Sequence, residues 1–165
     1  MLMLEREVLR QSLERCCGSR AWIDAMEKAL AGAGIDGTTL LLESERTFAG
    51  LDESDWLEAF AHHPKIGDLD SLASKFRATA DLASDEQRSA RAASRRTLEQ
   101  LRAANLEYER RFGYIFIVCA SGKSAVEMLQ LLRERLENDA QTELRHAAVE
   151  QRKITRLRLE AQFRV

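Results

Sequence analysis

Hydrophobic residues recur every three or four positions along most of this 165-residue chain, a spacing that places them on one face of an α-helix. A first helix is predicted over about residues 3–17, and Gly18 ends it. A second helix follows at once. After a glycine-containing loop, Thr38 or Thr39 can begin a third helix that reaches Phe48. The first part of the chain therefore predicts three short helices.

A fourth helix is predicted to begin after a cap at Asp52 or Ser54. Pro64 limits it, because a residue that precedes proline disfavours helical backbone, so the helix should end near His62. Beyond the loop that follows, a short irregular helix is expected through Phe76.

The second half of the chain predicts three more helices and one extended segment. Ser84 and Gln87 fit a capping box, and the helix that they begin should reach about Arg111. Residues 114–120 are the one strand-like stretch, and a buried extended segment is expected there because a single strand has no sheet partner. A second capping box at residues 124–127 begins another helix, and the last one runs from about 140 to beyond 160.

Composition supports this pattern, because the chain has 8 glycines and a single proline, whereas β-rich folds need both at their turns. The length suits one domain. We therefore predict an all-α fold: a single-domain helical bundle over residues 1–165 with one short extended segment near 114–120.

Charge and cysteine content exclude several classes of protein. The net charge is −2, and the arginines lie among acidic residues, as on a solvated helix face, so no nucleic-acid partner is expected. No apolar run has membrane-spanning length, and charges at Glu5, Arg6 and Glu7 interrupt any signal-like segment. Three cysteines, two of them adjacent, do not form a disulfide framework. A cytoplasmic protein is expected, with no membrane association.

Two motifs that could bind a cofactor are better explained otherwise. Gly122-Lys123-Ser124 resembles the end of a phosphate-binding loop, but Ile117 stands where that loop needs a glycine. His62 and His63 point about 100° apart on a helix, so they rarely share one metal ion. No metal site and no cofactor are expected.

His63 is the first candidate for catalysis. It continues the apolar face of Trp56 and Phe60, and an imidazole at the wall of an apolar pocket can titrate near neutrality and deliver a proton. A histidine that only packs in the core or lies on the surface remains the alternative.

Arg158 is the second candidate, because it falls on the same face of the last helix as Gln151 and Ile154. Arg156 points about 160° away from it. An arginine on a buried face needs an anionic partner, which is either an internal carboxylate or a substrate carboxylate or carbonyl. Both interpretations stay open, and Glu86 is equally explained by a favourable charge in the first turn of its helix.

Five short motifs occur along the chain in a specific order. They are His63-Pro64-Lys65-Ile66-Gly67-Asp68, Thr79-Ala80, Glu86-Gln87, Arg111-Phe112-Gly113-Tyr114-Ile115-Phe116 and Lys153-Ile154-Thr155-Arg156-Leu157-Arg158-Leu159. In this combination the chain resembles the family of 2-oxo-4-hydroxy-4-carboxy-5-ureidoimidazoline (OHCU) decarboxylases, from Cys16 to nearly the end.

The resemblance implies an all-α, commonly homodimeric enzyme that performs the last step of urate oxidation to (S)-allantoin without metal or organic cofactor. It implies His63 as the residue of proton transfer, with Glu86 catalytic and Arg158 holding the substrate. The implied substrate contacts are Pro64, Ala83, Ser84, Asp85, Glu86, Gln87, Phe116, Ile117, Val118, Cys119, Ala120 and Arg158. Family members often have serine where Ala83 stands, so this chain departs from the family there and lacks that hydroxyl, although Ser84 follows.

Two alternatives differ from this interpretation. A non-enzymatic helical interaction module would leave His63, Glu86 and Arg158 scattered in space. A related lyase would use the same scaffold on a different small-molecule substrate, since fold does not fix substrate.

Overall fold

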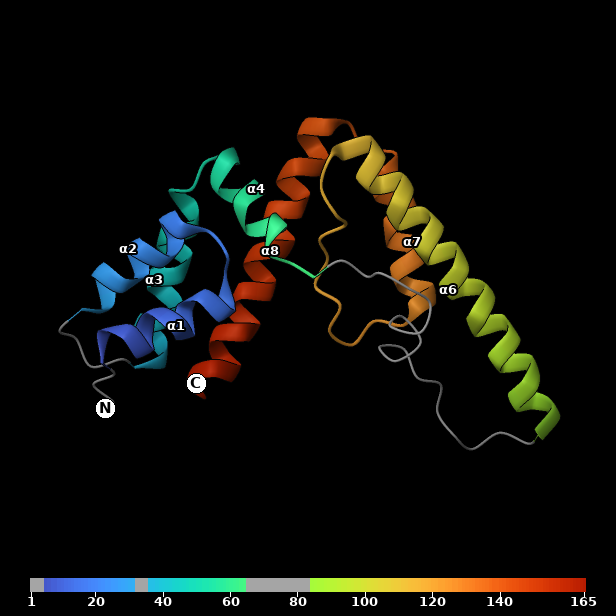
Figure 1. The fold of residues 1–165 in the computed structure, drawn as a ribbon, viewed down its shortest axis with the longest axis horizontal. Coiled ribbons are helices and arrows are strands. Elements are labelled where there is room, and N and C mark those ends of the chain that lie inside the picture. The colour runs from blue at the N-terminus through green and yellow to red at the C-terminus, as the bar shows by residue number, and fades with distance from the viewer. Residues whose placement is uncertain (1–4, 32–35, 65–83) are drawn as a thin grey trace. The chain divides into compact units, whose positions relative to one another are not determined.

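The computed structural model describes residues 5–31, 36–64 and 84–165, and for residues 84–93 it describes the helical backbone alone. These ranges hold seven helices and no strand, which confirms the all-α prediction (Figure 1). Contacts divide the chain into two compact units: residues 1–63, 117–119 and 144–165 form the first, and residues 64–116 and 120–143 the second. The single domain stays a prediction, and the short helix expected through Phe76 lies outside the described residues.

Four short helices form the N-terminal part of the first unit: α1 (Arg6–Cys16), α2 (Arg20–Leu30), α3 (Gly37–Ala49) and α4 (Glu53–Ala61). Ser19 caps α2 by accepting a hydrogen bond from the Trp22 N–H. The third helix begins before the Thr38 or Thr39 expected from the sequence, because the Asp36 side chain accepts from the Thr39 N–H and provides the cap.

The boundaries of α4 follow from two local signals. Asp52 accepts a hydrogen bond from the Asp55 N–H, and the Asp55 side chain accepts from the Asp52 N–H, so the two residues form a capping box. At the other end the helix stops at Ala61, with His62 as its C-cap, as the proline at position 64 predicts. This ending determines where His63 lies.

The core of the first unit is built from both ends of the chain. Leu159 of the last helix, α8 (Ala140–Phe163), packs in the same buried cluster as residues of α1 to α4. Trp22 of α2 and Phe48 of α3 contribute its aromatic contact, with ring centroids 6.2 Å apart. The Gln162 amide donates to the Ser12 hydroxyl at 3.5 Å, so the end of α8 lies against α1 (Figure 1).

The second unit contains α6 (Ser84–Phe112) and α7 (Ala125–Leu136), which pack side by side and run in the same direction (Figure 1). Gly113, with φ +83°, ends α6 in a conformation that favours glycine. The predicted capping box of Ser124 and Glu127 begins α7. Between the helices, residues 114–120 are neither helix nor strand, as expected.

The second unit contains a largely buried group of polar and charged side chains, which we name the Glu143 cluster: Glu143, Arg135, Asn138 and Tyr108. Glu143 is fully buried and accepts hydrogen bonds from Arg135 Nε at 2.7 Å, from Asn138 Nδ2 at 3.0 Å and from the Tyr108 hydroxyl. Burial and the bond to Glu143 raise the pKa of Tyr108, which therefore stays a donor. The Arg135 guanidinium also lies 4.5 Å from the centroid of the Phe116 ring, so the cluster holds the segment that follows α6.

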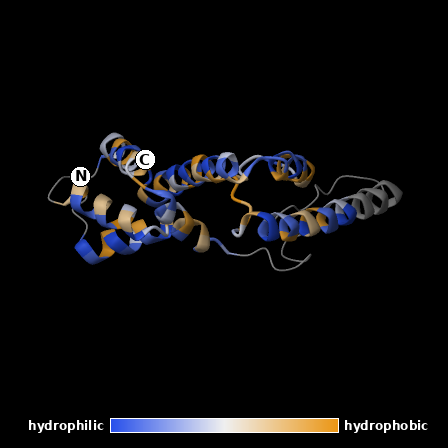
Figure 2. Cartoon of the chain, turned by 90° about the horizontal axis from the view of Figure 1, so that it is seen from above, coloured by the Kyte–Doolittle hydropathy of each residue, from blue (hydrophilic) through white to orange (hydrophobic). Residues whose placement is uncertain are grey.

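Hydrophobic and hydrophilic residues follow one another along each described helix rather than forming long apolar runs (Figure 2). Where the structure describes the chain, it contains no helix whose length and apolar character would suffice to cross a membrane. The helices instead bury one face each, which is the amphipathic pattern expected from the sequence.

Candidate functional site

His63 lies directly after the end of α4 and is half-buried. Its backbone N–H donates to the Phe60 carbonyl at 3.2 Å, which continues the last turn of the helix by one residue. Its ring atom Nε2 lies 2.6 Å from Gln151 Oε1 on α8. The ring is thus fixed by a partner 88 residues away in the sequence.

Gln151 extends this contact into a buried row of polar side chains, which we name the His63 relay: His63, Gln151, Thr155 and Cys17. Gln151 is 1% exposed, and its amide nitrogen donates to the Thr155 hydroxyl at 3.1 Å. Thr155 and Cys17 are also buried, and a hydrogen bond joins the Thr155 side chain to the Cys17 sulfur. The relay therefore satisfies its buried polar atoms from within.

The thiol of Cys17, which belongs to the relay, and that of its neighbour Cys16 are held in their neutral form. Burial raises the pKa of Cys17 to about 11, although hydrogen bonds from the Ser19 backbone and Thr155 and the charge of Arg158 oppose it. Burial likewise raises the pKa of Cys16 to about 11. Neither thiol has the lowered pKa of a nucleophilic cysteine.

The adjacent histidines have different surroundings. His62 is exposed, and its ring covers the α-carbon of Gly18 so closely that a β-carbon there would overlap it. His63 instead turns to Gln151. This difference favours His63 as the residue with a chemical role and gives His62 a packing role.

Arg158 does not lie where the sequence interpretation placed it. The fully buried stripe of α8 in the first unit consists of Ala147, Gln151, Thr155 and Leu159, and Arg158 flanks this stripe with an exposed side chain. Its charge opposes the rise that burial produces in the pKa of both Cys16 and Cys17, so the guanidinium is near these two thiols.

Arg156 and Arg158 differ in their partners. Arg156 Nε lies 3.1 Å from Glu160 Oε1 on the next turn of α8. Arg158 forms no ion pair with any carboxylate in the described part of the chain. Within those residues, the alternative of an internal carboxylate partner for Arg158 gains no support.

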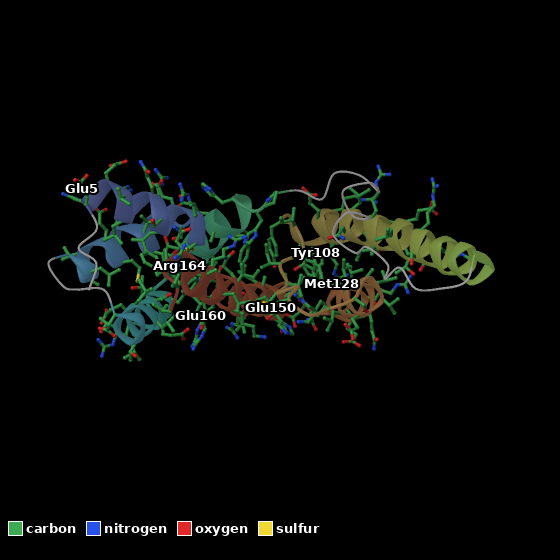
Figure 3. The ribbon with its side chains drawn as sticks, turned by 90° about the horizontal axis from the view of Figure 1, so that it is seen from below. Glu5, Tyr108, Met128, Glu150, Glu160 and Arg164 are labelled. Carbon is green, nitrogen blue, oxygen red and sulfur yellow. The ribbon has the colours of Figure 1, made fainter. Side chains whose placement is uncertain are left out.

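The segment of residues 117–119 is attached to α8 by Glu150. The Cys119 N–H donates to Glu150 Oε1 at 3.4 Å, and Lys153 Nζ lies 2.6 Å from Glu150 Oε2. Figure 3 shows Glu150 on α8, one residue before Gln151. Of the expected substrate contacts here, Ile117 is buried, whereas Val118 and Cys119 are half-buried.

The remaining expected site residues belong to the second unit. Pro64 is exposed, Phe116 and Ala120 are half-buried, and the Phe116 ring is engaged by Arg135. Ser84, Asp85, Glu86 and Gln87 form the first turn of α6, where the backbone alone is described, and Ala83 lies outside the described residues. That they join His63 and Arg158 in one site stays a prediction.

The sequence interpretation missed the roles of Glu150 and Gln151. A signal was present for Gln151, because a glutamine on an otherwise apolar helix face needs a buried partner. The described residues contain no group of three or more histidine, cysteine, aspartate or glutamate side chains arranged to hold a metal ion.

Comparison with known proteins places this arrangement in context. Residues 3–160 match the model of the OHCU decarboxylase family, which spans nearly the whole chain and every residue of the relay. The chain belongs to the OHCU decarboxylase family. A solved structure described as an OHCU decarboxylase in the presence of (S)-allantoin is 33% identical in sequence and superposes with a TM-score of 0.72, over 98% of this chain and 100% of that one.

Two curated proteins also resemble the chain in sequence. The uric acid degradation bifunctional protein TTL of Arabidopsis thaliana is 36% identical over 148 residues, which are 90% of this chain and 45% of that protein. The 2-oxo-4-hydroxy-4-carboxy-5-ureidoimidazoline decarboxylase of Xenopus laevis is 36% identical over 61 residues, which are 37% of this chain and 35% of that protein. The chain thus matches less than half the length of these curated relatives.

Proposed function

We propose that this chain decarboxylates OHCU to (S)-allantoin in urate degradation, as a carboxy-lyase that needs no cofactor. The observation that carries the proposal is the family match over residues 3–160, which includes both His63 and Arg158. The half-buried His63, held by a buried partner on α8, is consistent with a residue that must present its ring in one orientation.

The chemistry suits a site made only of side chains. Breaking the bond to the carboxyl carbon releases CO₂ and leaves an electron pair on the ring carbon, and the C=N group of the substrate itself can accept that pair. Accepting the pair forms a C=C bond between this carbon and its ureido-bearing neighbour, and the ring nitrogen takes up the C=N electrons and a proton. The hydroxyl group then becomes the carbonyl of allantoin as a proton is added to one face of the ureido-bearing carbon. The protein has to position the substrate, polarise it and deliver the proton, and we assign the proton to His63.

Other residues would orient the substrate. Arg158 is an exposed cation without an ion pair to a described carboxylate, so it can bind a substrate carboxylate or carbonyl. Glu86, in the first turn of α6, would orient the ureido group or His63. Backbone groups of residues 116–120 are further candidates, but the Cys119 N–H is already donated to Glu150. A homodimer remains expected from the family alone.

A pair of adjacent variants tests the function. The wild-type chain is added to freshly made OHCU, and optically active allantoin is followed by circular dichroism. Proton delivery in free solution has no reason to prefer one face, so the signal reports the protein. His63→Ala should lower kcat/KM by about 10²- to 10⁴-fold, as expected for the loss of a general acid. His62→Ala, the matched control, should stay within a few-fold of wild type.

Two results would contradict the proposal. An inactive wild-type chain, correctly folded by far-UV circular dichroism, would favour a related lyase with a different substrate or a non-enzymatic helical module. Equal losses in His62→Ala and His63→Ala would leave the activity standing but would remove His63 from its role.

A further inference from the structure

Gln151 is a buried amide whose two ends are both engaged. It is 1% exposed, in the middle of the buried stripe of α8, and its nearest polar neighbours are His63 on one side and Thr155 on the other. A leucine at this place would pack without the cost of burying an amide. The polar choice therefore points to a role for its hydrogen bonds.

The direction of those hydrogen bonds is determined by chemistry. A glutamine side chain has a carbonyl oxygen that only accepts and an amino group that only donates. The amino group donates to the Thr155 hydroxyl at 3.1 Å, which leaves Oε1 toward His63 Nε2 at 2.6 Å. Because Oε1 cannot donate, the hydrogen of this short contact must reside on His63 Nε2.

Thr155 supports the same orientation of the amide. Its hydroxyl oxygen lies 3.1 Å from the Gln151 amide nitrogen and can accept the hydrogen bond that this nitrogen donates. The amino group of Gln151 is then the end that faces Thr155, and the carbonyl is the end that faces His63.

We propose that Gln151 is a positioning residue that holds neutral His63 in the Nε2–H tautomer, so that His63 exchanges its catalytic proton through Nδ1. Its catalytic consequence rests on the function proposed above. In the proton-delivery step, the C=C electron pair of the decarboxylated intermediate takes the proton from Nδ1–H of the doubly protonated ring at the ureido-bearing carbon, while the hydroxyl group loses its proton and becomes the carbonyl. The N–H bonding pair returns to Nδ1, and the ring is left as the neutral tautomer that Gln151 stabilises.

The tautomer can be measured without any activity. The chain has three histidines, and ¹⁵N–¹H correlation spectra through two and three bonds distinguish a protonated Nε2 from a protonated Nδ1. The spectrum of His63→Ala assigns the signals by difference. In the wild-type chain, neutral His63 should show the Nε2–H pattern.

Two substitutions test whether Gln151 causes this pattern. Gln151→Met keeps a long unbranched side chain but removes the acceptor, so His63 should show a mixture of tautomers. Gln151→Glu keeps an acceptor oxygen and should restore the Nε2–H pattern. Gln141→Met, on the exposed face of the same helix, is the matched control and should leave the spectrum unchanged.

Kinetics separate positioning from simple packing. Gln151→Met should lower kcat by roughly 10- to 100-fold with KM within a few-fold, because a misplaced proton donor affects the chemical step more than substrate binding. Gln151→Glu should recover part of kcat. A packing role alone would lower the melting temperature without changing kcat per folded molecule.

The outcomes are distinguishable from failure of the proposed function. An Nδ1–H pattern for neutral His63 in the wild-type chain overturns the inference, and this spectrum needs no variant to fold. An unchanged tautomer and kcat in Gln151→Met overturn it as well. If wild type proves inactive on OHCU while the Nε2–H pattern depends on Gln151, the substrate proposal fails and the positioning of His63 by Gln151 stands.

Discussion

The Glu143 cluster of the second unit and the His63 relay of the first unit bury polar side chains of opposite kinds. In the second unit, the Glu143 cluster buries full charges: Glu143 and Arg135 are both buried and directly paired. In the first unit, the His63 relay buries neutral groups and ends at a side chain that is half-exposed. A buried ion pair fixes a local structure and has no reason to reach solvent. A row of neutral hydrogen-bonded groups that ends in an imidazole can instead fix the orientation of a ring that is partly open to solvent.

The largest effect is expected from breaking the charged cluster. Glu143→Gln should destabilise the protein by about 3–5 kcal/mol, because it leaves the buried guanidinium of Arg135 without a compensating charge. Urea unfolding followed by circular dichroism measures the loss. Glu137→Gln removes an exposed carboxylate at the end of α7 and should change the free energy of unfolding by less than about 0.5 kcal/mol. A similar small change for Glu143→Gln would show that the cluster is not a structural element.

The second-largest effect is expected on kcat/KM, from replacing Arg158. Arg135 is buried and paired, whereas Arg158 is exposed and pairs with no described carboxylate. If Arg158 binds substrate, Arg158→Ala should remove about 1.5–3 kcal/mol of binding, or roughly 10- to 150-fold in kcat/KM. Arg158→Lys should recover only part, since an ammonium group lacks the planar guanidinium fork.

Arg156 is the control for that experiment, because it lies on the same helix and is paired with Glu160. Arg156→Ala should stay within a few-fold of wild type in kcat/KM. An Arg158→Ala protein with a lower melting temperature and full activity would remove Arg158 from the site and assign it to stability.

The smallest effect is expected from the thiols of the first unit. Burial raises the pKa of Cys16 and Cys17 to about 11, above the ordinary value of 9.0. The folded protein therefore holds these protons more tightly than the unfolded chain does. The stability associated with them is fully present below about pH 9 and is lost as the pH rises toward 11.

Two measurements check the thiols. A Cys16→Ala, Cys17→Ala double variant should lose less of its unfolding free energy between pH 9 and 11 than wild type, compared by urea unfolding. In folded wild type at pH 8, a thiol reagent should modify half-buried Cys119 first. Rapid modification of all three cysteines before unfolding would contradict this view of the first unit.

Local features of the fold could be predicted from the sequence because their causes lie within a few residues. The capping box at Ser124, the stop at Gly113 and the limit that Pro64 imposes on α4 each depend on neighbouring positions alone. The start of α3 was missed because Asp36, rather than a threonine, provides the cap.

The site could be predicted only in part, because its contacts join distant positions. His63 was indicated by its place after the apolar face of α4, but its partner Gln151 is 88 residues away. Helical spacing predicts on which side of α8 Arg158 lies, but it does not predict how wide the buried stripe of that helix is. The sequence analysis therefore placed Arg158 on the buried face, whereas its side chain is exposed. Glu143 and Arg135 are buried although charged, and spacing alone does not distinguish them from a solvated face.

The discontinuous make-up of the first unit has a consequence for synthesis. A chain is made from its N-terminus, so α1 to α4 are complete long before Leu159, which completes their hydrophobic cluster, has been added. The contact between His63 and Gln151 likewise cannot form until Gln151 has been added to the chain. During that interval the second unit already has α6 and α7, which pack on one another and are joined by residues 113–124. The first unit, which holds His63, is therefore completed after the second, and until then its helices expose apolar faces to solvent.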